Sequence, residues 1–232
     1  MTVKFIVSCG NKGKTFNAVV ALFGLAHGAD ERHVEALIRA LRDCLPSGTV
    51  CLVSQDDYYL PIEKQVADAN GKINFDLPGA IDLGQFAEDL RSLASGEPIY
   101  KQEYTFNQPG VEPKWLEVRP APVILVEGLF LLHHEAIREQ FHLKVFVEAS
   151  EEVQLQRRLS RDLAERGYGS GDVRYQWENH VMPAYRNYLM PYRSLCDLHV
   201  INEERFDMAL SVIGDHLVRK AGIAVPFESQ PL

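Results

Sequence analysis

Short apolar runs alternate with stretches of helical periodicity along most of this chain. Apolar runs of strand length stand at 3–8, 49–54, 122–128, 143–149 and 198–201. The run at 122–128, PVILVEG, is apolar over most of its length, as a strand covered on both faces would be. The alternation predicts an α/β domain with a parallel five-stranded sheet flanked by helices.

Helical spacing predicts the elements between those runs. Ala18, Leu22 and Leu25 recur at helical spacing. A helix is therefore expected to begin near Lys14, and Asp30 is placed to cap a second helix. Further helices are predicted over 151–166, 172–190 and 205–220.

Two segments lack helical periodicity. Residues 96–118 combine Gly, Pro, aromatic and β-branched residues, which predicts a small β-hairpin that protrudes from the sheet. The tail at 223–232 is expected to be loosely held. The length of 232 residues fits one domain, predicted here over 1–222.

Composition narrows the class of protein. The chain is 46% hydrophobic and 24% charged, with a net charge of -8 that argues against a general duplex-binding surface. The four cysteines follow no metal-ligand spacing, nothing resembles a secretory signal, and the N-terminal apolar run is far too short to span a membrane. We expect a cytoplasmic protein with reduced thiols and no nucleic-acid or membrane partner; a homo-oligomer is left open.

A glycine loop follows the first predicted strand. Residues 8–15, SCGNKGKT, end as a phosphate-binding loop ends, although Ser8 stands where the pattern G-x-x-x-x-G-K-[ST] has its first glycine. In such a loop, Lys14 would reach the β- and γ-phosphates and the Thr15 hydroxyl would ligate Mg²⁺. A strand before it and a helix after it are the expected context, so the pattern predicts a nucleotide site. The alternative is a turn that leads into a helix.

Carboxylates follow two of the predicted strands, at the sheet edge where ligands of α/β proteins bind. Asp56, in SQDDYYLP, could accept a proton from a substrate hydroxyl or help to hold a metal ion. Glu127, at the end of VILVEG, is placed to lie beside Mg²⁺. The alternatives are that Asp56 caps the next element and that Glu127 pairs with a lysine.

A basic run at 156–172, QRRLSRDLAERGYGSGD, ends in a glycine-rich stretch. Arg158 and Arg161 are three apart and share a helix face, and Arg166 follows on the same helix. Arginines on such a lid, predicted over 157–172, can close over a transferring phosphoryl group. The alternative is a solvated face on which Asp162 and Glu165 pair with the arginines.

Together these motifs resemble the uridine kinase-like branch of P-loop kinases, which includes nicotinamide riboside kinases and phosphoribulokinases. The resemblance spans about residues 3–202. The segments that resemble the family, in family order, are SQDDYY, INFDLPGAID, VILVEGLFLL, RRLSRDLAERG and HVMPAYRNYLMPYR.

The resemblance implies a P-loop NTPase-type fold with ATP and Mg²⁺ as cofactors, and it implies roles for single residues. The nucleotide-binding residues would be Gly10, Asn11, Lys12, Gly13, Lys14, Thr15 and Phe16. The catalytic residues would be Asp56, which deprotonates a 5′-hydroxyl, with Lys14, Arg161 and Arg166. The metal-binding residues would be Thr15, Asp56 and Glu127. The substrate-binding residues would be Asp56, Tyr59, Asp76, Tyr104, Arg158 and Gln176, with Asp76 on the ribose hydroxyls.

Three positions depart from the uridine kinase pattern. Ser8 replaces the first loop glycine, Pro109 stands where a base-contacting histidine would fall, and Tyr168 replaces a lid arginine. The last two changes remove a base contact and a phosphate contact. Ribose recognition is therefore expected, while the base is left open.

The sequence thus favours an ATP-dependent kinase that phosphorylates the 5′-hydroxyl of a ribonucleoside, uridine, cytidine or a related riboside. A nicotinamide riboside kinase is the alternative within the enzyme class. A protein that binds a nucleotide without phosphoryl transfer is the alternative of another class. The departures at Ser8, Pro109 and Tyr168 motivate it, whereas the presence of Lys14 and Asp56 argues against it.

Overall fold

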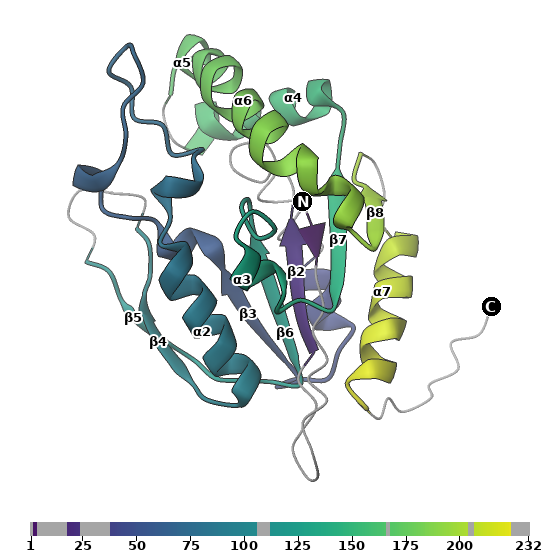
Figure 1. The fold of residues 1–232 in the computed structure, drawn as a ribbon. Coiled ribbons are helices and arrows are strands. Elements are labelled where there is room, and N and C mark those ends of the chain that lie inside the picture. The colour runs from purple at the N-terminus through teal and green to yellow at the C-terminus, as the bar shows by residue number, and fades with distance from the viewer. Residues whose placement is uncertain are drawn as a thin grey trace.

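A twisted sheet lies at the centre of the molecule, with helices on both faces (Figure 1). The structure is a computed structural model that describes residues 2–3, 18–23, 38–105, 112–165, 168–203 and 207–223. The strands of this sheet are β1 (Thr2–Val3), β2 (Ala18–Phe23), β3 (Val50–Ser54), β6 (Val123–Gly128), β7 (Leu143–Glu148) and β8 (Leu198–Ile201). Their order is β3-β6-β2-β1-β7-β8, and β2 also pairs directly with β7. Every pairing is parallel except those of β1, which runs antiparallel to β2 and β7.

Four predicted strands form where the apolar runs placed them. β3, β6 and β7 differ from the predicted ranges by one residue at an end, and β8 coincides with its range. Of the predicted strand at 3–8, only Val3 lies within the described residues, and it belongs to the antiparallel β1.

The helix predicted from Lys14 through Leu25 is wrong over 18–23. These residues, AVVALF, form β2, which pairs in parallel with β6 and β7. A continuous apolar run satisfies helical spacing and a buried central strand equally well, so pairing within the sheet decided between them. The residues on either side of this strand, 4–17 and 24–37, lie outside the described part.

Helices surround the sheet. They are α2 (Leu83–Ser95), α3 (Glu135–Arg138), α4 (Glu151–Glu165), α5 (Ser170–Gln176), α6 (Met182–Ala184) and α7 (Asp207–Lys220), with helical residues also at 38–43. Short 3₁₀ turns η1 (Gln55–Tyr58), η2 (Ile62–Lys64) and η3 (Pro78–Ala80) lie between β3 and α2. A helical arm, residues 170–195, joins α5, α6, the π-helical turns η4 (Trp177–Val181) and η5 (Tyr185–Leu189) and the 3₁₀ turn η6 (Met190–Leu195).

Helix α2 was not predicted from helical spacing, although a capping residue at its start and a glycine at its end indicate it in the sequence. The Asp82 carboxylate accepts a hydrogen bond from the Gln85 backbone N–H at 2.9 Å, which caps the first turn. Gly96 ends the helix in a left-handed conformation with φ of 94°. Helix α4 lies within the predicted 151–166 and α7 within the predicted 205–220, and residues 166 and 205–206 lie outside the described part of the chain.

The sheet separates two hydrophobic cores. On one face, Ile124 and Val126 pack with residues of α2 and the helical arm. On the other face, Val123 and Leu125 pack with residues of α7 and of the 38–43 helix. This alternation along β6 explains why its sequence is apolar without a break.

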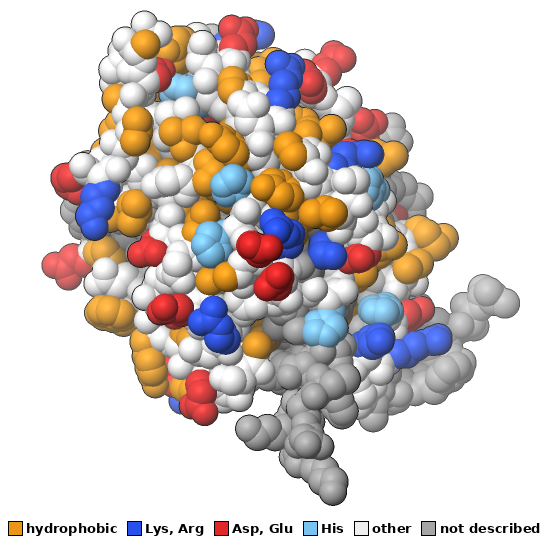
Figure 2. All heavy atoms as spheres, in the orientation of Figure 1, with side chains coloured by type: hydrophobic (Ala, Val, Ile, Leu, Met, Phe, Trp, Pro, Cys, Tyr) orange, Lys and Arg blue, Asp and Glu red, His pale blue; other side chains and the backbone are white. Residues whose placement is uncertain are grey.

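The predicted hairpin forms outside the main sheet. Strands β4 (Ile99–Gln102) and β5 (Trp115–Val118) pair antiparallel as a separate two-stranded sheet. On the face shown in Figure 2, acidic and basic side chains are interspersed rather than gathered by sign. Among the described helices, none is long and apolar enough to cross a membrane.

Gly128 ends β6 where the chain passes the buried Gln55. Its φ is 155°, and a Cβ built there would lie 2.3 Å from the Gln55 Cβ. The Gln55 Oε1 in turn accepts a hydrogen bond from the Phe130 N–H at 2.8 Å. This close approach of two segments needs a residue without a side chain.

We therefore expect Gly128→Ala to lower the free energy of unfolding by about 1–3 kcal/mol, because the added methyl overpacks a buried contact. Urea unfolding followed by circular dichroism measures this. The matched control is Gly84→Ala, in the first turn of α2, where an added Cβ meets only the Asp82 Oδ1 at 3.5 Å. An equal loss in both variants would contradict the close-approach explanation.

Candidate functional site

Two predicted carboxylates lie at the same edge of the sheet. Strands β3 and β6 pair in parallel with Ser54 opposite Glu127, and Asp56 follows Ser54 by two residues. The Ser54 hydroxyl, not a carboxylate, caps turn η1 by accepting from the Asp56 N–H at 3.2 Å. The alternative role of Asp56 as a cap is therefore excluded for this turn.

The donor chemistry at this edge fits Mg²⁺. Carboxylate oxygens are the ligands that Mg²⁺ takes from proteins, usually one or two of them together with phosphate oxygens and water. Asp56 and Glu127 supply two such groups from neighbouring strand ends. Within the described residues, no cluster of three or more His, Cys, Asp and Glu side chains could hold a metal by itself. Thr15 lies outside them.

The hairpin is tied to the residue next to Asp56. The Lys101 ammonium, on β4, pairs with the Asp57 carboxylate, and only 7% of the Lys101 side chain is exposed. The other oxygen of Asp57 accepts from the Tyr104 backbone N–H at 3.3 Å. Sequence reasoning missed Asp57 and Lys101, because nothing in the sequence pairs two residues 44 positions apart.

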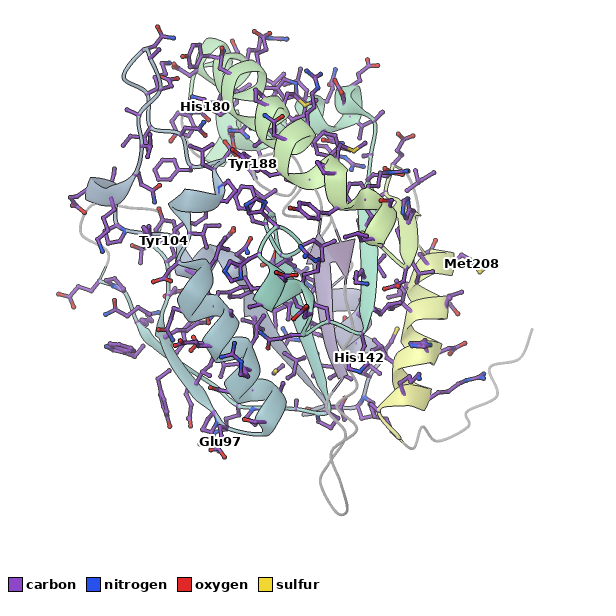
Figure 3. All side chains as sticks on the ribbon, viewed as in Figure 1. Glu97, Tyr104, His142, His180, Tyr188 and Met208 are labelled. Carbon is purple, nitrogen blue, oxygen red and sulfur yellow. The ribbon has the colours of Figure 1, made fainter. Side chains whose placement is uncertain are left out.

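This tie brings together three aromatic rings. Tyr104 lies 5.2 Å from Tyr59 between ring centroids, and Tyr59 lies 6.1 Å from Phe75 in an edge-to-face contact. Figure 3 labels Tyr104 at the hairpin side of the molecule. Tyr59 is buried within the hydrophobic core, so it serves packing as well as lining this aromatic wall.

Opposite charges are buried together where α4 meets the segment before α2. The Asp162 carboxylate binds the Arg161 guanidinium at 2.7 Å and the Arg158 Nε at 3.3 Å. Arg158 also donates to the Gln176 Oε1, on α5, at 2.7 Å. The predicted pairing with Asp162 is thus correct, but the face is buried and not solvated.

Asp76 belongs to the same cluster. Burial raises the pKa of its carboxyl to about 6, while the positive charges of Arg158, His180 and Arg161 act in the opposite direction. Three segments remote in sequence, the one before α2, α4 and α5, therefore place Asp76, Arg158, Arg161 and Gln176 near one another.

A cavity of about 310 Å³ borders the segment that bears Asp76. Its lining includes Val66, Asn74, Leu77, His133 and Tyr188, and none of the predicted site residues lines it. Tyr188 projects from the helical arm (Figure 3).

The predicted nucleotide-binding residues, 10–16, lie outside the described part of the chain, as does Arg166. Their context differs from the prediction, because the residues that follow are strand β2 and not a helix. At the edge with Asp56 and Glu127, the chain leaves β2 at Phe23 and continues in sequence as GLAHGADE. That stretch begins with a glycine but has Asp30 and Glu31 where the loop pattern has Lys and Ser or Thr.

Comparisons with known proteins show which family this chain resembles. The profile of the phosphoribulokinase/uridine kinase family matches residues 46–208. A uridine kinase of Deinococcus deserti is 32% identical over 191 residues, which cover 81% of this chain and 92% of the relative. Uridine-cytidine kinase B of Dictyostelium discoideum is 30% identical over 176 residues, which cover 76% of this chain and 72% of the relative.

A solved structure supports the fold. Phosphoribulokinase from Rhodobacter spheroides superposes with a TM-score of 0.57 at 18% identity, covering 79% of this chain and 68% of that chain. The chain therefore belongs to the phosphoribulokinase/uridine kinase family, with the α/β fold of its P-loop kinases. Membership of this family supports an ATP-dependent kinase of the uridine kinase type. The matched residues contain each described candidate site residue and begin after Thr15.

The Asp57–Lys101 pair, in which Lys101 is buried and Asp57 half-buried, predicts a stability effect. Lys101→Met leaves the Asp57 carboxylate without its cation, so the free energy of unfolding should fall by about 3 kcal/mol. Adding Asp57→Asn should restore much of the loss, because no unpaired charge then remains at this half-buried position. Urea unfolding of the two single variants and the double variant measures this, and a double variant that is less stable than Lys101→Met contradicts it.

Proposed function

We propose that this protein transfers the γ-phosphoryl group of ATP to the 5′-hydroxyl of a ribonucleoside or a related riboside. The proposal includes Mg²⁺ as a cofactor and a cytoplasmic role in nucleoside salvage. Uridine and cytidine are the first candidate acceptors, because relatives are named uridine kinase and uridine-cytidine kinase. Nicotinamide riboside is the alternative acceptor.

The observation that carries the proposal is the convergence of Asp76, Arg158 and Gln176. A buried carboxylate, a guanidinium and an amide oxygen present both acceptors and donors, as the vicinal hydroxyls of a ribose require. The aromatic wall of Tyr59, Tyr104 and Phe75 supplies flat apolar surface for a base. Both lie on the sheet face that bears the helical arm and α2.

Asp56 is proposed to orient the acceptor hydroxyl and accept its proton as it attacks the γ-phosphate. Asp56 and Glu127 would hold Mg²⁺, which neutralises phosphate charge when it is bound. Lys14, Arg161 and Arg166 are assigned to the transferred phosphoryl group and residues 10–16 to ATP. Little covalent work falls to the protein, so positioning and electrostatic stabilisation supply the rate.

A second candidate is a protein that binds a riboside without transferring phosphate. The sequence after β2 favours it, since Asp30 and Glu31 stand where a phosphate loop has Lys and Ser or Thr. Two carboxylates would repel the phosphates of ATP. The presence of Asp56, Glu127 and Lys14 favours the kinase.

ADP release across a panel of ribosides tests the two candidates. We expect turnover with at least one of uridine, cytidine and nicotinamide riboside in the presence of ATP and Mg²⁺. Asp56→Ala should lower kcat by about 10²–10⁴-fold, because the general base is lost, while ATP still binds. Lys14→Ala should weaken both ATP binding and turnover.

Two outcomes would contradict parts of this assignment. Riboside binding by calorimetry without ADP release from any acceptor favours the non-catalytic protein. Full turnover by Lys14→Ala contradicts the assignment of the phosphate loop to residues 8–15.

The pKa of Asp76 predicts a pH dependence for riboside binding. Only the ionised carboxylate accepts hydrogen bonds at both oxygens, so protonation below about pH 6 weakens the grip on the ribose hydroxyls. The KM for the riboside should rise about tenfold between pH 7 and pH 5. In Asp76→Asn the KM should be high and nearly independent of pH over this range; an unchanged wild-type profile would refute the assignment of Asp76.

A further inference from the structure

A tight turn, residues 66–74, precedes Asp76. Its two arms pair through the Asp68 N–H to the Lys72 carbonyl and the Asn74 N–H to the Val66 carbonyl, both at 2.8 Å. The Asp68 Oδ1 accepts from the Asn70 and Lys72 N–H groups, both at 2.9 Å. One oxygen of the Asp68 carboxylate thus fixes the shape of the turn.

The other oxygen of Asp68 binds the helical arm. Its Oδ2 accepts from the Tyr175 hydroxyl at 2.6 Å and lies 2.7 Å from the His180 Nε2. These hydrogen bonds hold the pKa of the Asp68 carboxyl well below its usual range. An ionised carboxylate only accepts hydrogen bonds, so the His180 Nε2 carries a proton and donates it. The Asn70 amide also donates to the Tyr175 hydroxyl at 2.6 Å.

Both ends of this contact continue into the proposed riboside site. On the turn side, the Asn74 Oδ1 accepts from the Asp76 N–H at 2.9 Å. On the arm side, Tyr175 precedes Gln176, which binds Arg158. The His180 side chain is 2% exposed and close enough to Asp76 for its charge to favour the ionised carboxyl. In Figure 3, His180 lies on the side of the arm that faces the segment before α2.

We propose that Asp68, Tyr175 and His180 form a clasp that positions Asp76 against Arg158 and Gln176, and so sets how strongly the site prefers a riboside to a 2′-deoxyriboside. The inference rests on the proposed function. The three clasp residues act through Asp76 and Gln176, and they are positioning residues.

Discrimination is the property that the clasp should control. A site that hydrogen-bonds a substrate hydroxyl rejects the analogue without it, because the buried polar group of the site is then left unpaired. This rejection depends on holding the acceptor at hydrogen-bond distance from the missing hydroxyl. If the turn moves away from the arm, Asp76 loses its contact with the 2′-hydroxyl, and the riboside loses more affinity than the 2′-deoxyriboside does.

Two variants with small changes in volume test the clasp, Asp68→Asn and Tyr175→Phe. We expect the KM of the riboside to rise about tenfold, the effect of a weakened hydrogen bond to a charged group, with kcat changed less than twofold. The ratio of kcat/KM for the riboside to that for the 2′-deoxyriboside should fall by about fivefold or more. Tyr100→Phe is the matched control, because it removes the hydroxyl that donates to the exposed Glu117 carboxylate at 3.1 Å and should leave the ratio unchanged.

A double-mutant cycle tells whether Asp68 acts through Asp76 or only stabilises the fold. If the clasp acts through Asp76, Asp68→Asn should no longer raise the riboside KM in an Asp76→Asn background. Thermal unfolding of each variant sets an assay temperature at which all are folded. Equal losses for riboside and 2′-deoxyriboside, or effects that add in the double variant, overturn the inference.

Binding measurements separate this inference from the proposed function. If the wild type binds uridine without turnover, the same ratio is taken from the dissociation constants of uridine and 2′-deoxyuridine. Binding with an unaltered ratio in the variants overturns the clasp alone. A wild type that binds neither uridine, cytidine nor nicotinamide riboside overturns the clasp and the riboside site together.

Discussion

Two arginines and two aspartates buried in one cluster constrain much of this structure. Asp162 binds both Arg158 and Arg161, which leaves one positive charge in excess, and Asp76 supplies the second negative charge. Burying charges is costly unless each is matched by an opposite charge and hydrogen bonds in good geometry. Helix α4, the helical arm and the segment before α2 must therefore meet at one place, and the proposed riboside site is the product of that meeting.

The nearby positive charges do not fully offset the cost of burying the Asp76 carboxylate. Its pKa of about 6 is above the ordinary value of 3.8, so the ionised group is less favourable in the fold than in the unfolded chain. Its contribution to the free energy of unfolding is therefore largest at acidic pH and declines as pH rises from about 4 to about 6. A carboxylate held at a cost to stability is common at functional sites.

Much of the scaffold could be predicted from the sequence. Strands β3, β6, β7 and β8 are apolar runs with clear ends, and the hairpin and α7 follow from local pattern. The strand at 18–23 could not be, because an unbroken apolar run fits two periodicities, and sheet pairing chose between them. In the site, Asp76 came from a family motif, whereas Asp56 and Arg158 came first from a strand end and a basic run. The Asp57–Lys101 and Asp68–His180 contacts join residues 44 and 112 positions apart. Asp57 and His180 belong to family segments, but nothing in those segments indicates their partners Lys101 and Asp68.

Strand β2 lies between two stretches that are candidates for phosphate binding, and the residues proposed to bind the acceptor all follow it in sequence. Each described group assigned to the acceptor lies after residue 50, on or next to η1, in the segment before α2, by the hairpin, on α4 or on the arm. The proposed phosphate loop, 8–15, and the glycine-containing stretch, 24–31, lie before residue 50 and stand on either side of β2 in sequence. The loop proposed to bind the phosphates of ATP is thus encoded apart from the residues proposed to bind the acceptor, whereas Glu127 and Arg161, proposed for Mg²⁺ and the phosphoryl group, lie in the same part as the acceptor residues. Acceptor preference can therefore change through substitutions after residue 50 that leave the sequence of the proposed phosphate loop intact.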